Sequence, residues 1–167
     1  MMRQYKTSGM SPADWQAVAQ IYLEGIESGL ATFETEVPSW ERWDASHLHF
    51  GRSVLRVDDE VLGWCALSRV SPRQVYSGVT EVSVYVASKA RGRGLGGVLL
   101  NTLIEDSESH GIWTLQASIF AENHASLQLH RRCGFREVGR RERIGKLGGI
   151  WRDTILLERR SKVVGVS

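Results

Sequence analysis

The chain has 167 residues, 42% of them hydrophobic and 24% charged, a balance that predicts one ordinary globular domain and excludes a disordered chain. Its formal net charge of +2 is too small to indicate a nucleic-acid-binding surface. No apolar run approaches the ~20 residues of a membrane span, and the first residues lack the apolar core of a signal peptide, so we expect a cytoplasmic protein that does not bind membranes.

Along the chain, the first predicted elements are a short strand over residues 2–6 and a helix that begins at Pro12. Ser11 supplies an N-cap and Asp14 follows three residues later, as in a capping box. Gly29 is the expected stop. Apolar residues at helical spacing predict a buried stripe of Trp15, Val18, Ala19, Tyr22 and Leu23.

Residues 30–38 show neither the hydrophobic periodicity of a helix or strand nor the composition of a flexible loop. Two interpretations stay open: a packed loop with its aromatic Phe33 in the core, or a wall of a substrate site, since loops on a rigid scaffold often carry specificity. Composition alone favours the packed loop. A helix is expected from Ser39, with Trp40 and Trp43 on one face.

The remaining elements are mainly strands, expected over residues 53–57, 61–70, 79–86, 112–120, 135–144 and 150–157. Asn123 is expected to cap a helix over residues 125–133 that ends at Gly134. No repeat or linker intervenes. Residues 1–167 are therefore expected to form a single α+β domain, with one mixed, mostly antiparallel sheet flanked by helices and a loose tail from about residue 159.

Neither the cysteines nor the histidines show the spacing of a metal site. Cys65 stands in an apolar strand pattern and Cys133 just before Gly134, so buried free thiols are expected rather than a disulfide, a nucleophile or metal ligands. The five histidines show no zinc-ligand spacing, and we expect no metal. The basic run at residues 140–143 is interrupted by Glu142 and is interpreted as a solvated face.

A glycine-rich turn after the strand at residues 79–86 is the most informative motif. Its glycines, at 92, 94, 96 and 97, let the backbone approach a ligand with no Cβ atom in the way. The helix that follows would present unpaired N–H groups and its positive dipole end to the same ligand. These features predict a pyrophosphate cradle. A P-loop is excluded because Gly-Lys-Ser/Thr is absent, and the Rossmann fingerprint is only half met and lies mid-chain.

The pattern that fits this turn is Arg/Gln-x-x-Gly-x-Gly, met by Arg91, Gly94 and Gly96 after a Val-Tyr-Val strand. It resembles the acetyl-CoA loop of the GCN5-related N-acetyltransferases. Up to about Glu158 the chain looks like the phosphinothricin acetyltransferase branch of that family, through matches at residues 31–35, 80–86, 91–96, 123–126, 129–130, 134–135 and 149–153. The resemblance implies the three-layer fold of that family.

The resemblance also implies an acetyl-CoA-dependent enzyme that acetylates the free α-amine of a small amino-acid analogue, such as phosphinothricin, arsinothricin, methionine sulfone or sulfoximine. It further implies direct transfer without an acyl-enzyme, a role in detoxification or resistance, and a homodimer with its active site near the interface. Two alternatives stay open: an acetyltransferase of protein N-termini or ribosomal proteins, and a non-catalytic acetyl-CoA-binding module. Glu81 and the intact substrate loop speak against the binding module.

Two residues are candidates for proton transfer. An amine attacks a thioester only when neutral, so a base must take its proton. Glu81 is the candidate; a lone strand glutamate is more often a surface residue, but the family pattern reverses that preference. His130 stands where many family members have a tyrosine. It is either the proton donor to the departing thiolate or a packed helix residue whose ring bonds a carbonyl.

Acetyl-CoA binding is expected at the strand end and the glycine turn. Backbone groups of Val84 and Val86, on either side of Tyr85, would pair with the amide-rich arm of acetyl-CoA as one strand extends another. The loop contributes Arg91, Gly92, Arg93, Gly94, Leu95 and Gly96. Each arginine could equally be solvated. Asn123 is expected to be both a helix cap and a cofactor contact.

Recognition of an acidic amino acid calls for a guanidinium, which forms paired bonds to carboxylate or phosphinate oxygens. Arg73 is the first choice, with Tyr76 beside it. Gly78 departs from the larger residues usual in this branch, which leaves the identity of the substrate open.

Four further residues are expected at the substrate. Phe33 and Glu34 would shape the pocket and hold the ammonium, and Lys146 and Trp151 would reach the site from a second subunit. Trp151 could instead be an apolar anchor in the final strand.

Overall fold

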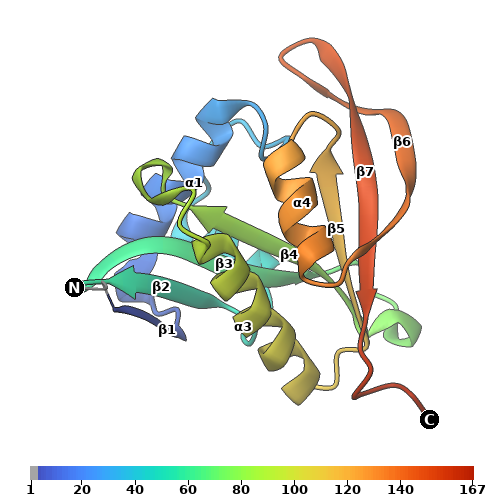
Figure 1. The fold of residues 1–167 in the computed structure, drawn as a ribbon. Coiled ribbons are helices and arrows are strands. Elements are labelled where there is room, and N and C mark those ends of the chain that lie inside the picture. The colour runs from blue at the N-terminus through green and yellow to red at the C-terminus, as the bar shows by residue number, and fades with distance from the viewer. Residues whose placement is uncertain (1–3) are drawn as a thin grey trace.

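A seven-stranded sheet runs through the molecule, with helices on both of its faces (Figure 1). The computed structural model describes residues 4–167. The strands lie in the order β1-β2-β3-β4-β5-β7-β6, and every neighbouring pair is antiparallel except β4 and β5, which are parallel. The expected fold class, a mixed and mostly antiparallel sheet flanked by helices, is confirmed.

The elements follow the alternation of strands and helices that the sequence predicts. The strands are β1 (Tyr5–Gly9), β2 (Ser53–Val57), β3 (Glu60–Arg69), β4 (Val79–Val86), β5 (Thr114–Phe120), β6 (Arg136–Leu147) and β7 (Ile150–Arg160). The helices are α1 (Trp15–Ser28), α2 (Trp40–Ser46), α3 (Leu95–Ser109) and α4 (His124–Arg132), with short 3₁₀ turns η1 (Pro12–Asp14), η2 (Gln74–Tyr76) and η3 (Ser88–Ala90).

Neighbouring residues of β3 show how the helices divide between the two faces. Trp64 packs edge-on against Tyr22 of α1, with ring centroids 5.6 Å apart. A Cβ atom on Gly63 would lie 2.7 Å from Leu99 of α3. Because successive strand residues point to opposite faces, α1 and α3 cover opposite faces of the sheet. Trp43 of α2 also contacts Trp64, at 5.7 Å, so α2 lies on the α1 face.

The parallel pair β4 and β5 stays together for only three residues. Val79, Thr80 and Glu81 pair with residues 114–116, and in the described chain no pairing between these strands continues beyond Glu81. Figure 1 shows the two strands running apart from this point. The C-terminal half of β4 therefore has β3 on one side and a gap on the other.

Several predicted boundaries need correction. The first strand, expected over residues 2–6, runs from Tyr5 to Gly9 because it pairs along the whole of β2; residues 2 and 3 lie outside the described part. The expected capping box is present, since the Ser11 amide donates to Asp14 Oδ2 at 2.9 Å. However, Pro12–Asp14 is a 3₁₀ turn and the α-helix starts at Trp15.

The buried stripe of α1 also differs from the expected one. Val18, Ile21, Tyr22 and Gly25 are buried, whereas Trp15, Ala19 and Leu23 are only partly buried. The stripe thus continues at helical spacing toward the C-terminal half of α1, where Gly25 faces the sheet. Gly29 ends the helix in the left-handed conformation, as predicted.

The two cysteines are free, as predicted. Cys65 is fully buried in β3, and burial raises the pKa of its thiol to about 12. Cys133 is only partly buried rather than buried. Strand β7 continues to Arg160, and the Ser161 hydroxyl donates to Glu108 at 2.8 Å, so ordered contacts extend past residue 159. Among the described residues, no helix is long and apolar enough to cross a membrane.

Candidate active site

Three adjoining cavities surround the place where β4 and β5 separate. The central cavity, of about 320 Å³, lies between residues 81–85 of β4, residues 117–120 of β5 and the loop at residues 30–34. Asn123, Ser126 and His130 close it from the side of α4. The gap in the sheet is therefore the site at which side chains from four segments converge.

The second cavity, the glycine-loop groove, holds about 390 Å³. It runs along residues 84–86 of β4 and the glycine turn, between α1 and α4. Gly92 and Gly94 have φ angles of 77°, and open space lies where their Cβ atoms would stand. A negatively charged group can therefore approach the backbone and the first-turn N–H groups of α3 closely.

The third cavity, the tryptophan cleft, is the largest of the three at about 920 Å³. It lies on the α1 and α2 face of the sheet. Its walls are aromatic at the base and polar along the rim, and include Tyr22, Trp43, Trp64, Glu34, Glu36 and Arg42.

Tyr85 lines all three cavities. Its ring stacks on Trp64 at 4.6 Å and meets Tyr22 edge-on at 5.1 Å. The central cavity shares Val84 and Asn123 with the groove, and Glu34 with the cleft. The cavities thus form a continuous path, with Tyr85 at the junction. Burial raises the pKa of the Tyr85 hydroxyl, so the ring stays uncharged there.

Glu81 lines the central cavity from the last position of β4 that pairs with β5. Its Oε2 accepts a hydrogen bond of 3.2 Å from Gln116 Nε2, and its side chain is half-buried. Gln116 is its direct neighbour on β5. The amide fixes one carboxylate oxygen and leaves the other able to accept a proton from a group in the cavity.

His130 is buried on α4 and lines the same cavity. Its Nδ1 lies 2.7 Å from the Ser126 carbonyl oxygen, so Nδ1 carries the hydrogen and Nε2 has a lone pair. Burial lowers the pKa of the imidazole, which keeps the ring neutral. Of the two interpretations of His130, the structure therefore shows the helix residue bonded to a carbonyl. A neutral ring in this tautomer can accept a proton at Nε2 but has none there to give.

The residues expected to bind acetyl-CoA mostly gather at the groove. Val84, Tyr85, Val86, Arg91, Gly92, Gly94, Leu95, Gly96 and Asn123 all line it. Arg93 does not line the groove and donates to the Lys89 carbonyl oxygen at 3.3 Å. Asn123 caps α4 by accepting from the Ser126 amide at 3.2 Å, as predicted, and donates to the Leu30 carbonyl oxygen at 3.0 Å. It therefore joins α4 to the loop at residues 30–34.

The expected substrate residues divide into two groups. Phe33 and Glu34 line the central cavity. Phe33 is 36% exposed and packs edge-on against Phe120 at 4.7 Å, so the loop is a cavity wall and not the core-packed loop that composition favoured. The reason is that β5 ends at Phe120 beside the gap, which gives Phe33 a partner at the cavity edge.

The other four substrate residues do not reach the three cavities of their own chain. Arg73 directly precedes the exposed turn η2 and Tyr76 ends it, with the guanidinium 5.4 Å from the centre of the tyrosine ring. Lys146 and Trp151 pair with each other across the β6–β7 hairpin, at 5.1 Å. Trp151 is 55% exposed, so it is not an apolar anchor of the core.

Three residues at the site had no motif to mark them: Gln116, Tyr22 and Arg42. The sequence gives no distinctive signal for Gln116, since Thr114 and Ser118 of the same strand are also polar. Tyr22 and Arg42 reach the connected cavities because α1 and α2 pack on the sheet face that carries the Tyr85 side chain. The sequence of either helix alone does not show this packing.

Comparison with known proteins agrees with this geometry. The family model described as "Acetyltransferase (GNAT) family" matches residues 15–135. The L-methionine sulfoximine/L-methionine sulfone acetyltransferase of Pseudomonas aeruginosa is 34% identical over 152 residues, which cover 87% of this chain and 88% of that protein.

Two solved structures are also close. The ribosomal-protein-alanine N-acetyltransferase from Brucella melitensis aligns with a TM-score of 0.86 and 31% identity, over 93% of this chain and 99% of that one. The second structure is a GNAT superfamily phosphinothricin acetyltransferase from Sinorhizobium meliloti, solved in complex with acetyl-CoA. It aligns with a TM-score of 0.86 and 26% identity, over 98% of this chain and 91% of that one.

Proposed function

The chain belongs to the acetyltransferase (GNAT) family and is an N-acetyltransferase; on this premise we propose that it acetylates the free α-amine of a small amino-acid analogue. The proposed donor is acetyl-CoA, and the acceptors are of the phosphinothricin, arsinothricin and methionine sulfone or sulfoximine class. The observation that carries the proposal is the continuous path from the glycine-loop groove past Glu81 to the tryptophan cleft. A donor and an acceptor entering from opposite ends meet at Glu81.

The glycine-loop groove fits acetyl-CoA. The glycine turn and the start of α3 would hold the pyrophosphate, and Arg91 on the rim would add a charged contact. In the part of the chain that the structure describes, no strand lies beside residues 84–86 of β4 on the β5 side, so their backbone can pair with the amides of the pantetheine arm. When bound, acetyl-CoA supplies an activated acetyl thioester.

The chain's own residues then account for the proton movements. Glu81 takes the proton of the acceptor's ammonium, directly or through a water, and Gln116 holds the carboxylate in place. His130 Nε2 is a second proton acceptor on the opposite wall. A thiol has a pKa near ~8.5, so a thiolate can leave without a dedicated donor. Neither cysteine lines these cavities, which fits direct transfer without an acyl-enzyme.

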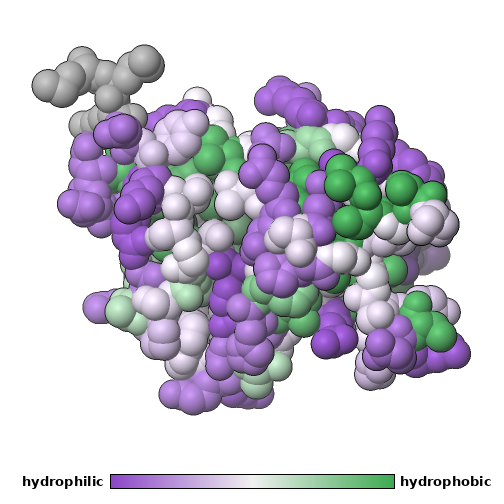
Figure 2. Space-filling view, turned by 90° about the horizontal axis from the view of Figure 1, so that it is seen from below, coloured by the Kyte–Doolittle hydropathy of each residue, from purple (hydrophilic) through white to green (hydrophobic). Residues whose placement is uncertain are grey.

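A second copy of the chain would complete the acceptor site. Arg73 and Tyr76 are exposed and lie outside the cavities of their own chain, so a role in substrate binding requires that they act on the partner's site. Lys146 and Trp151 are likewise exposed and outside these cavities, so the same requirement applies to them. Figure 2 shows hydrophobic residues gathered on the right-hand side of one face of the molecule. Exposed apolar residues there would favour a homodimer.

The test of this function is a thiol-release assay with acetyl-CoA and a panel of acceptors, with mass spectrometry of the products. Phosphinothricin, arsinothricin, methionine sulfone and methionine sulfoximine should each release thiol and gain one acetyl group on the α-nitrogen. Release only with peptides that carry the N-terminus of a ribosomal protein would instead support the second candidate function, which the likeness to the Brucella enzyme favours. If no acceptor causes thiol release, the remaining alternative, a non-catalytic acetyl-CoA-binding module, would be supported.

A further inference from the structure

We propose that Arg42 of α2 is a specificity-determining residue, which binds the negatively charged or strongly dipolar oxygen group at the end of the acceptor's side chain. This inference rests on the proposed function, because it concerns the acceptor of the same reaction. The oxygen group of the acceptor would then be bound by Arg42 of the chain that also supplies Glu81. The acceptor side chain would lie in the tryptophan cleft.

The first support is the position of Arg42 in the cleft. Among residues 4–167, Arg42 is the only lysine or arginine that lines the central cavity or the tryptophan cleft. The acidic residues Glu34, Glu36 and Glu81 line the same two cavities. An acceptor with an anionic side chain would meet three carboxylates there, so its acidic end is accommodated best beside Arg42.

The second support is that the guanidinium of Arg42 has no partner in the described chain. Its backbone amide donates to Ser39 Oγ at 3.3 Å, and its side chain makes no hydrogen bond or ion pair within residues 4–167. Asp44, on the same short helix, is occupied by Arg52. The Arg42 side chain therefore keeps all of its donors for a ligand in the cleft.

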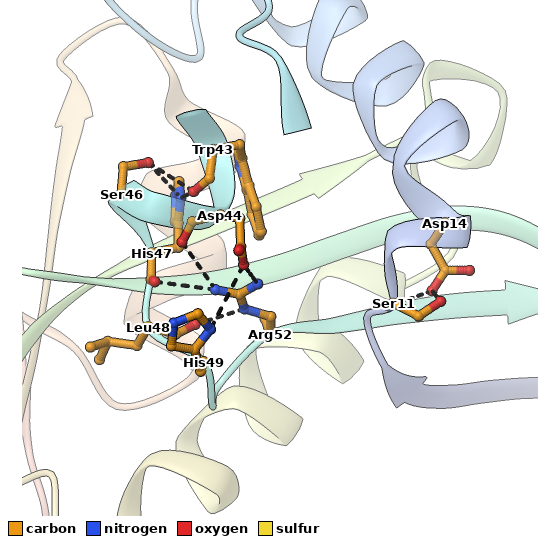
Figure 3. Close-up of polar contacts among 9 residues, drawn as sticks. All are labelled: Ser11, Asp14, Trp43, Asp44, Ser46, His47, Leu48, His49 and Arg52. Carbon is orange, nitrogen blue, oxygen red and sulfur yellow. Dashed lines mark hydrogen bonds and ion pairs between the residues drawn. The ribbon is translucent and has the colours of Figure 1, made fainter. Parts of the chain in front are cut away.

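Arg52 shows the opposite case and serves as a comparison. Figure 3 shows its guanidinium directed at Asp44 and at backbone carbonyl groups of the segment after α2. Its Nε donates to the Leu48 carbonyl oxygen at 2.7 Å, and its Nη2 donates to the His47 carbonyl oxygen at 3.1 Å. Only 8% of its side chain is exposed. Arg52 thus holds the end of α2 in place, whereas Arg42 projects from the same helix unengaged.

The third support is the aromatic lining of the tryptophan cleft, the cavity that Arg42 also lines. Trp43, Trp64 and Tyr85 line the cleft. Trp43 and Trp64 are buried and back the wall, and the partly buried ring of Tyr85 offers apolar surface to the methylene groups of an extended side chain. An acceptor of the proposed class has an amine and carboxylate at one end and an oxygen-bearing group at the other. The two adjoining cavities match this order, with Glu81 in the central cavity, Tyr85 lining both cavities, and the exposed Arg42 in the cleft alone.

The test compares Arg42→Gln with the wild type on three acceptors: phosphinothricin, methionine sulfone, and methionine, which lacks the sulfone oxygens. Losing a bond to a charged group should raise the KM for phosphinothricin about tenfold to a hundredfold. The KM for methionine sulfone should rise less, and that for methionine should stay within about twofold, because methionine offers no oxygen to a guanidinium. The kcat should be unchanged for all three, since Arg42 acts on binding and not on the reacting atoms.

Two further variants separate this role from general effects. Arg42→Lys keeps the charge without the planar fork and should give an intermediate KM for phosphinothricin. Arg69→Gln removes an exposed arginine outside the three cavities and should change nothing. The inference is overturned if Arg42→Gln leaves the KM for phosphinothricin unchanged or raises all three KM values equally. A wild-type enzyme that acetylates none of the three would instead contradict the proposed function itself.

Discussion

The side chains of Tyr85 and His130 reach the central cavity from opposite walls, and burial acts on both in the direction that keeps them neutral. It raises the pKa of the Tyr85 hydroxyl and lowers that of the His130 imidazole, since a charge loses its hydration when buried. Glu81 is half-buried and keeps contact with solvent. Neither the Tyr85 hydroxyl nor the His130 imidazole therefore contributes a charge to the central cavity at neutral pH.

The lowered pKa of His130 predicts a pH dependence of stability. As the pH falls below the ordinary imidazole pKa of about 6.5, the unfolded chain takes up a proton at residue 130 before the folded chain does, so the free energy of unfolding falls. His130→Gln removes this contribution and should lose less stability between neutral and mildly acidic pH. Urea unfolding at several pH values measures the difference, and equal pH slopes for both proteins would contradict it. The pKa of His47 is also lowered by burial. His47 is present in both the wild type and the variant, so its contribution cancels in the comparison.

At single residues, sequence reasoning succeeded where a short motif carries the chemistry. Glu81, Phe33 and Glu34 lie at the central cavity as expected. Arg42 and Gln116 could not be found in this way, because their roles depend on contacts across the sheet and not on neighbours in sequence. Arg73 was chosen for its residue type, and residue type alone does not say which chain's cavity a side chain serves.

At the scale of elements, the junction of the three cavities depends on Gly25, in the C-terminal half of α1. A Cβ atom on Gly25 would lie 2.6 Å from the Tyr85 ring. Glycine weakens a helix interior by roughly 0.5–1 kcal/mol relative to alanine, so its presence in α1 is best explained by the close approach of Tyr85.

Gly25→Ala should therefore harm function more than stability. The gain in helix propensity partly offsets the cost of overpacking, about 1 to 3 kcal/mol, while the Tyr85 ring must move away from α1. We expect a KM for acetyl-CoA raised several-fold, with retained folding by circular dichroism. Ala19→Gly, in the same helix but on its partly buried side, is the control for helix propensity. Unchanged kinetics in Gly25→Ala would show that the position of the Tyr85 ring does not control the connection between the three cavities.

The strands were predicted best where alternation and flanking turns agree, as in β2 and β4. The start of α1 was placed three residues early, because a capping box and proline also suit the 3₁₀ turn at residues 12–14. The separation of β4 from β5, which creates the site, has no local sequence signal. It depends on where residues of two distant strands stop pairing.

For the whole molecule, the exposed turn η2 leads to a prediction about assembly. If Arg73 serves the partner's site, mixing Glu81→Gln and Arg73→Ala chains creates dimers with one complete site. With random exchange, activity toward phosphinothricin should recover to about a quarter of the wild-type level, because half of the dimers then carry one intact site of two. Refolding the two variants together and assaying thiol release measures this. No recovery in mixtures shown to be dimeric would exclude action of Arg73 in trans.

The central claim is that acetyl transfer takes place at the gap between β4 and β5, with Glu81 accepting the proton of the acceptor amine. The pH profile of kcat/KM for Glu81→Gln tests it most directly, since glutamine keeps the size of the side chain and can still bond Gln116. We predict a loss of about 10²- to 10⁴-fold at neutral pH, unchanged affinity for acetyl-CoA by calorimetry, and partial recovery at high pH, where more of the amine is already neutral. A Glu81→Gln protein with the wild-type rate and pH profile would contradict the account.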